Sequence, residues 1–270
     1  MMAMSPCPRK ENCTNNHILL VDSNAILNLM KTKLPKVDRT YSLRKYFRDF
    51  LSEYDSLLNK VFACSIDGNN YITKKIFEEI DMENSRSSLR CEPEFKVLRV
   101  ICQNLTDFGE MNEVHRKAFS IKEIDDADLK KLRESGLISK GRVSNQDLSL
   151  AVLALRKILE TDQESVIITD DEDFKSFLRR LRSRGQISMS FGHVNCSKLS
   201  SRYLSTYLAE IYECCKMEKS EYETVFLRLC KMQEERTDLV DIQKKKLKQE
   251  AFDVSTSIFI KTTITKYPNL

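Results

Sequence analysis

Four acidic side chains stand where a fold of alternating strands and helices would gather carboxylates at one place. They are Asp22, Glu79, Asp147 and Asp171. Asp22 closes a short apolar segment, Asp171 follows another, and Glu79 and Asp147 lie within helices that the sequence predicts. Residues at the carboxyl ends of parallel strands and at the amino ends of the next helices meet at one edge of an α/β sheet. We therefore expect these four side chains to converge.

A cluster of this kind predicts a metal site. Neighbouring carboxylates without basic partners repel one another, and a bound divalent cation relieves that repulsion. Hard oxygen ligands select Mg²⁺ or Mn²⁺ rather than zinc. Such an ion lowers the pKa of a bound water molecule and neutralises the charge that develops on a phosphodiester during in-line attack. The chemistry expected from the cluster is hydrolytic cleavage of a nucleic acid.

Each acid also has a simpler interpretation. An aspartate at the end of a strand is often a helix cap or a turn residue, and Asp147 together with Ser144 resembles a capping box. Glu79, taken alone, is an ordinary residue of a solvated helix face. The metal site is favoured because all four acids occur in order, each in its own strand and helix context.

The elements that must position the cluster alternate between strand and helix from residue 17 to residue 194. This alternation predicts a three-layer α/β/α sandwich, in which helices cover both faces of a central parallel sheet. Strands are predicted over 17–22, 61–66, 71–72, 165–169 and 186–194, and helices over 25–30, 41–61, 74–80, 95–105, 125–135, 144–159 and 173–184.

The chain divides into three regions on this pattern. Residues 1–16 are expected to be a flexible N-terminus and 17–195 the α/β domain. Residues 196–270 are expected to form an all-helical C-terminal extension, with helices over 199–217, 221–235 and 242–264 and no strand. We expect the extension to modulate substrate access or to mediate assembly, as a homo-oligomer or with a protein partner.

Composition excludes several classes of protein. Glycine and proline number 6 and 5 of 270 residues, about 4% where about 12% is average, which excludes collagen-like and linker-like chains. The 44 basic and 40 acidic residues leave a net charge of +4, too small for a polybasic protein. Nine cysteines without a CxxC pair favour a reduced, cytoplasmic chain. No apolar run approaches the roughly 18 residues of a membrane span, so neither spanning nor export is expected.

Four segments carry a family resemblance. They read LVDSNAI from Leu20, ITKKIFEEI from Ile72, SNQDLSLAVLAL from Ser144 and ITDDEDF from Ile168. Their order and their strand and helix context resemble the acidic signature of PIN-domain ribonucleases, closest in style to those of ribosomal-RNA maturation. The resemblance covers residues 17 to 194. It implies a sandwich around a parallel sheet and metal-dependent endonucleolytic cleavage of single-stranded RNA that leaves a 5′-phosphate.

The resemblance also assigns roles to individual residues. Asp22 matches the first family carboxylate, Glu79 the second in preference to its neighbour Glu78, and Asp147 the third. The pattern Thr-x-Asp selects Asp171 as the fourth, with Asp170 as an alternative or additional ligand. Accessory positions, which would hold a metal-bound water or a substrate phosphate, are matched by Ser23, Asn145 and Thr169. Long insertions between the acids and the lack of a zinc ribbon after the domain depart from the family pattern.

A basic helix face follows Asp171. Its members are Lys175, Arg179, Arg180, Arg182 and Arg184. These side chains are predicted to hold an RNA backbone beside the acidic cluster, or else to be only the solvated face of an amphipathic helix. Taken together, the sequence predicts a metal-dependent endoribonuclease. The alternatives are a catalytically inactive PIN-like scaffold that binds RNA or protein, and a toxin-like tRNA or rRNA nuclease, although the chain is long for the latter.

Overall fold

The computed structural model describes most of the predicted α/β domain and part of the segment after it. The described residues are 17–34, 43–62, 70–81, 108–138, 143–212 and 217–235. Among these residues, no helix is both long enough and apolar enough to cross a membrane.

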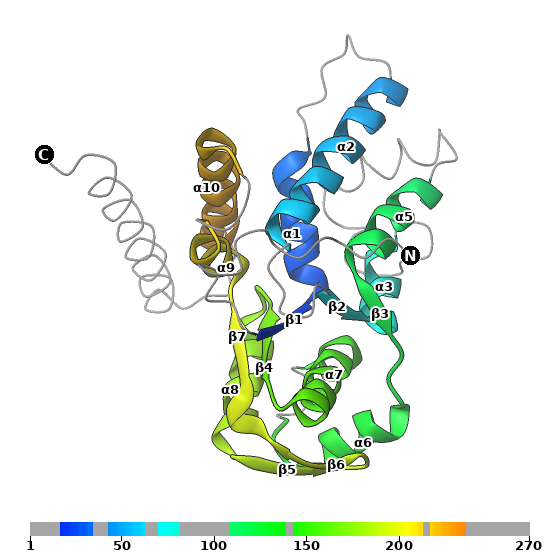
Figure 1. Ribbon diagram of the computed structural model, residues 1–270, viewed down its shortest axis with the longest axis vertical. Helices are drawn as coiled ribbons and strands as arrows, with labels where there is room; N and C mark the ends of the chain where they lie inside the picture. Colours follow the sequence, from blue (N-terminus) through cyan, green and yellow to red (C-terminus); the bar gives the residue numbers. More distant parts are fainter. Residues whose placement is uncertain are drawn as a thin grey trace, which may run out of the picture.

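A five-stranded parallel sheet lies at the centre of the fold (Figure 1). In spatial order its strands are β3 (Ser120–Lys122), β2 (Asn70–Thr73), β1 (His17–Val21), β4 (Glu164–Ile168) and β7 (Leu199–Arg202). The central pair, β1 and β4, are short apolar segments whose register sets Leu19 beside Val166. Both residues are buried, as strands covered on two faces require.

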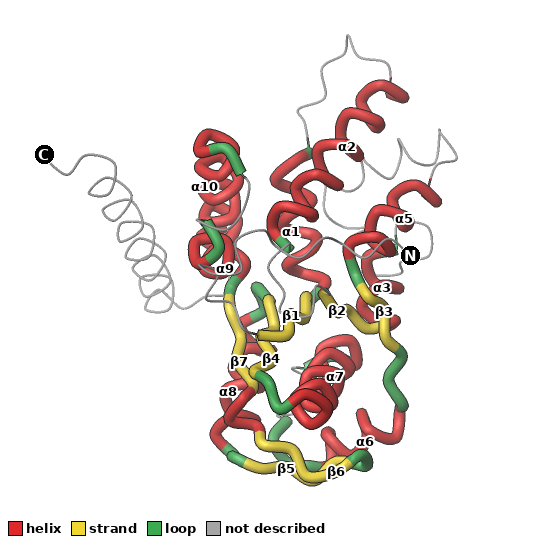
Figure 2. Tube along the Cα trace, in the orientation of Figure 1, coloured by secondary structure: helices red, strands yellow, loops and turns green. Residues whose placement is uncertain are grey.

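Helices cover both faces of the sheet, which confirms the predicted three-layer sandwich. They are α1 (Ser23–Lys33), α2 (Leu43–Val61), α3 (Lys74–Ile80), α5 (Phe108–Ala118), α6 (Asp126–Glu134), α7 (Asn145–Thr161), α8 (Glu172–Ser183), α9 (Leu204–Glu210) and α10 (Lys219–Glu235). Figure 2 shows α1, α2, α5 and α10 on one side of the sheet and α6 and α7 on the other.

Helix α7 contains the longest run of consecutive buried residues among the described helices. Every residue from Asp147 to Leu155 on this helix is buried, and it contacts β1, β2, β4 and β7. A helix that is apolar around its whole circumference must be covered on all sides. Its first turn is therefore held at a fixed place beneath the sheet, and with it the predicted ligand Asp147.

The predicted strand over 186–194 is wrong, because the segment forms a hairpin. Strands β5 (Gln186–Met189) and β6 (Gly192–Asn195) pair antiparallel in a separate two-stranded sheet, with Ile187 opposite Val194. Gly192 follows the turn directly and has a φ of 140°, a backbone conformation that residues other than glycine rarely adopt. The alternation of apolar and polar residues that predicted one strand extends over two short strands and the turn between them.

The expectation that no strand follows residue 195 is also wrong. Strand β7 pairs with β4 and forms one edge of the central sheet. Its sequence, LSSR, carries one apolar residue, so its strand character comes from pairing rather than from hydrophobicity. The helix expected over 199–217 shrinks to α9, and the boundary expected at 195/196 precedes a strand of the main sheet.

Other predictions fall partly or wholly outside the described residues. The expected strand over 61–66 cannot begin at Val61, which ends α2, and 63–66 are not described. The flexible N-terminus over 1–16 and the helices expected over 95–105 and 242–264 also lie outside. The helix predicted over 74–80 has the bounds of α3.

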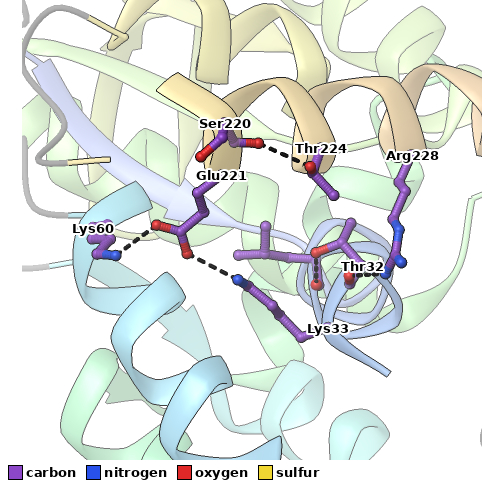
Figure 3. A network of polar contacts seen from close by, with 8 residues as sticks. Thr32, Lys33, Lys60, Ser220, Glu221, Thr224 and Arg228 are labelled. Atoms are coloured by element: carbon purple, nitrogen blue, oxygen red, sulfur yellow. Dashed lines mark hydrogen bonds and ion pairs between the residues drawn. The ribbon is translucent and has the colours of Figure 1, made fainter. Parts of the chain in front are cut away.

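Helix α10 is held against α1 and α2 by polar contacts (Figure 3). Glu221 accepts a hydrogen bond from Lys33 Nζ at 2.8 Å and another from Lys60 Nζ at 2.6 Å. Two turns further on, the Arg228 guanidinium donates to the carbonyl oxygen of Thr32. The described part of the C-terminal segment therefore packs on the α/β domain of its own chain.

We expect Glu221→Gln to lower the free energy of unfolding by about 0.5–1 kcal/mol near pH 7, because the ion pairs are partly exposed and screened. Burial raises the pKa of Glu221, but Lys33 and Lys60 outweigh this effect and leave the pKa below its usual value. The stabilisation is therefore present above the ordinary glutamate pKa and is lost as the pH falls through the lowered one. Urea unfolding at pH 7 and pH 3 measures it, with the exposed Glu223→Gln as control.

Candidate functional site

The predicted cluster lies at the point where the order of the strands reverses. From β1 the chain passes to β2 on one side, whereas β4 adds on the other side of β1. Asp22 follows β1, and the segment Thr169–Asp171 follows β4. The two strand ends are joined by a hydrogen bond from the Asp22 backbone N–H to the carbonyl oxygen of Ile168, 2.9 Å long. Open α/β sheets bind ligands at such a switch point.

Ser23 joins Asp22 to Glu79. Its hydroxyl lies 2.8 Å from Glu79 Oε2 and 3.3 Å from Asp22 Oδ1, with the shorter contact as the main hydrogen bond. Glu79 is half-buried on α3, whereas its neighbour Glu78 is exposed. Helix α3 is fixed at its start by Thr73, whose hydroxyl accepts from the Ile76 N–H. The structure thus brings Glu79, rather than Glu78, into contact with the first half of the cluster.

Thr169 joins Asp22 to Asp171 from the other side. Its hydroxyl donates to Asp22 Oδ2 at 2.7 Å and accepts the Asp171 backbone N–H at 3.1 Å. Asp171 in turn caps α8, since its Oδ1 accepts the Phe174 N–H at 3.0 Å. Ser23 and Thr169, both predicted as accessory residues, are therefore the two side chains that tie the acids together.

Asp147 forms the capping box that its spacing suggested. Its Oδ2 accepts the Ser144 N–H at 2.8 Å, and its own N–H donates to Ser144 Oγ at 3.1 Å. This structural role does not separate Asp147 from the cluster, because its charge raises the pKa of both Asp22 and Glu79. Asp147 is thus both the cap of α7 and a neighbour of the other acids.

The acids perturb one another electrostatically. Burial raises the pKa of Asp22 well above its usual value, and the charges of Asp147, Glu79 and Asp171 raise it further, while the Thr169 hydrogen bond opposes them. Burial likewise raises the pKa of Glu79 and of Asp147. All four predicted acids therefore belong to one interacting group, whose shared need is positive charge.

Asp170 faces a different set of partners. Its Oδ2 accepts from Asn28 Nδ2 on α1 at 2.7 Å, and its Oδ1 accepts from the Leu204 N–H at 3.0 Å and from Gln233 Nε2 at 3.4 Å. Each carboxylate oxygen thus holds another element of the fold. These contacts connect Asp170 to α1, α9 and α10, whereas Asp171 is the member of the pair whose charge acts on Asp22.

Sequence reasoning missed Asn28. The signal was present, because Asn28 stands between Leu27 and Leu29 in the apolar run AILNLM within α1. A polar side chain in a fully apolar helix segment is buried, and a buried polar group needs a hydrogen-bond partner. The missing piece was the identity of that partner, Asp170, which lies 142 residues away.

The remaining predicted residues lie at the periphery. Asn145 is exposed at the start of α7, where its Oδ1 accepts from Arg133. Arg180 on α8 and Arg184 at its C-cap donate to the backbone carbonyl oxygens of Leu137 and Ser135, at 3.2 Å and 2.7 Å. Arg179 pairs with Glu172, and Arg182 is exposed. Lys175 lies over the ring of Tyr203. The basic face is therefore partly engaged in holding α8 to its neighbours.

The oxygen donors of the cluster are of the kind that a hard divalent cation prefers, but they are not arranged as a complete coordination shell. Carboxylate and hydroxyl oxygens are the ligands of Mg²⁺ and Mn²⁺. Within the described ranges, no three His, Cys, Asp or Glu side chains are grouped closely enough to hold a metal ion. Metal ligation by the four acids is thus supported by the chemistry of the donors and stays a prediction.

Comparison with known proteins leaves the family open. No family model matches the chain, and no curated protein or solved structure does either. The resemblance to PIN-domain ribonucleases therefore rests on the four sequence segments.

We expect Asp22→Asn to stabilise the protein in the presence of EDTA, by on the order of 1 kcal/mol at pH 8, because it removes a buried charge among like charges. Since the pKa of Asp22 is raised in the folded state, the wild type loses stability as the pH rises through that value, and the gain from the substitution grows with pH. Urea unfolding between pH 5 and pH 8 measures this gain. The control is Asp125→Asn, an exposed cap of α6; an equal gain in the control would contradict the explanation.

Proposed function

We propose that the protein is a metal-dependent endoribonuclease. The observation that carries the proposal is the convergence of Asp22, Glu79, Asp147 and Asp171, which come from four separate segments, at the switch point of a parallel sheet. The capping roles of Asp147 and Asp171 do not require Asp22 and Glu79 beside them, and burial of a carboxylate beside like charges is destabilising. Clusters of carboxylates with perturbed pKa values that lower the stability of the fold are typical of functional sites.

The proposed roles of the residues follow from their contacts. Asp22, Glu79, Asp147 and Asp171 would supply oxygen ligands to Mg²⁺ or Mn²⁺. Ser23 and Thr169 orient the carboxylates of Asp22 and Glu79 through their hydroxyls. When bound, the ion would lower the pKa of a water molecule and offset the charge on the attacked phosphate. The complete burial of Asp22 keeps bulk water from its carboxylate.

RNA is the proposed substrate because of the resemblance and of the basic face on α8. Exposed Arg179, Arg180 and Arg182 lie on the helix that Asp171 caps, and exposed Arg184 is its C-cap. Such side chains contact phosphates and fix the position of a strand without reading its sequence. The scaffold alternative is supported by a specific observation, namely that Asp147 and Asp171 each cap a helix and would be kept for that reason in an inactive protein.

We expect the purified protein to cleave single-stranded RNA with Mn²⁺ or Mg²⁺ and to leave 5′-phosphate ends. Asp22→Asn and Asp147→Asn should reduce the rate at least about 100-fold, because each removes a negative charge that the ion requires. Asp125→Asn, the same substitution at an isolated cap, should keep full activity. Gel analysis of a panel of single-stranded and structured RNAs measures the rates.

Two results would reject the nuclease proposal. One is equal cleavage by the wild type and both cluster variants, which would indicate a contaminant. The other is binding of RNA without cleavage under either metal, which would leave the scaffold as the function.

We expect Arg182→Ala to weaken RNA binding two- to fivefold and to reduce the salt dependence of binding by about one counterion. Fluorescence anisotropy with an unstructured oligonucleotide measures both, in the Asp22→Asn background to avoid cleavage. Lys117→Ala, on α5, is the control. The Lys117 side chain is exposed, and its replacement removes one positive charge on the opposite side of the sheet. An equal loss in both variants would show that only overall charge matters.

A further inference from the structure

A buried hydrogen bond crosses the fold beside the carboxylate cluster without joining it. Asn28 Nδ2 donates to Asp170 Oδ2 at 2.7 Å, and the two residues are 4% and 5% exposed. Asn28 lies on α1, five residues after Ser23. Asp170 lies between Thr169 and Asp171. One end of the bond is therefore fixed to the helix that begins with Ser23, and the other to the segment that follows β4.

This bond spans the two halves of the cluster. The first half is Asp22, Ser23 and Glu79, and the second is Thr169 and Asp171. The halves meet through the hydrogen bond from Thr169 to Asp22 and through the backbone bond from the Asp22 N–H to Ile168. Both contacts lie at the ends of β1 and β4. The Asn28–Asp170 bond adds a buried side-chain contact from α1 to the residue directly before Asp171.

We propose that Asn28 and Asp170 are a positioning pair that fixes the orientation of the two halves of the carboxylate cluster relative to each other and so affects the affinity of the cluster for a divalent cation. This inference rests on the metal-dependent function proposed above, and it assigns Asp170 a place outside the metal ligands. Its carboxylate is committed on both oxygens, to α1 on one side and to α9 and α10 on the other. Groups that orient metal ligands commonly change metal affinity 10- to 100-fold when they are replaced.

The chemistry of the pair allows a test by reversal. In Asn28→Asp/Asp170→Asn, the new amide at position 170 places its nitrogen toward residue 28 and keeps its oxygen toward the Leu204 N–H. The hydrogen bond is retained with donor and acceptor exchanged, and the total charge is unchanged. Two single variants break it, because Asn28→Asp sets two carboxylates face to face and Asn28→Leu removes the donor.

The affinity for Mn²⁺ alone, measured by electron paramagnetic resonance, is the first readout. We expect each single variant to bind Mn²⁺ about tenfold more weakly than the wild type. The reversed pair should return to within about twofold. Thr32→Val is the matched control, because it removes a buried hydroxyl one turn further along α1, whose bond goes to Leu29 of the same helix. It should leave the affinity unchanged.

Amide hydrogen exchange without metal is the second readout. The N–H groups of Asp171 and Phe174 are bonded to Thr169 and Asp171 side chains, so their exchange reports the order of the second half. Both should exchange at least about fivefold faster in Asn28→Asp and return to the wild-type rate in the reversed pair. Circular dichroism confirms that each variant is folded.

Several outcomes would overturn the positioning role. They are single variants equal to the wild type in both readouts, an equal loss in Thr32→Val, or a reversed pair that recovers exchange but not Mn²⁺ affinity. The last result would make Asp170 a ligand itself. A wild type that binds no Mn²⁺ would reject the proposed function instead. The exchange rates alone would then test whether the pair orders the second half of the cluster.

Discussion

The fold is organised around the burial of carboxylates that have acids, rather than bases, as their charged neighbours. Asp22 is fully buried, and the charges that act on it come from Asp147, Glu79 and Asp171. An ionised carboxylate in such surroundings needs hydrogen-bond donors and favourable dipoles. Hydroxyl groups provide the first, through Ser23 and Thr169. Helix ends provide the second, since Asp22, Asp147 and Asp171 all stand at helix N-termini, where the macrodipole favours negative charge.

This requirement explains why the site needs the whole sandwich. The helices that begin at the cluster are α1, α7 and α8, and α1 and α7 lie on opposite sides of the sheet (Figure 2). Only where two neighbouring strands, β1 and β4, lead to helices in different layers can several N-termini approach one point. The buried length of α7 fixes one of them, and the packing of α10 on α1 supports another. The meeting of the acids and the placement of helices in two layers both follow from the same strand order.

The sequence was sufficient for features that depend on local pattern. The apolar runs before Asp22 and Asp171 predicted β1 and β4, and the Ser144 cap predicted the start of α7. The strand β7 was missed because an edge strand of sequence LSSR gains its stability from pairing with β4, which no local pattern records. The hairpin over β5 and β6 was missed because alternation continues across its turn. The partner of Asn28 was equally beyond reach, since a contact over 142 residues depends on the finished topology.

The segment Thr169–Asp171 shows how closely the site and the fold are joined. Thr169 and Asp171 turn toward the carboxylate cluster, while Asp170 between them holds α1 and the start of α9. Three consecutive polar residues thus contact two different parts of the fold, so a displacement of one affects the contacts of the others. Because Leu204 and Gln233 both donate to Asp170, the docking of α9 and α10 acts on the same backbone that presents Asp171. The helices beyond β7 are for this reason part of the structure that shapes the site.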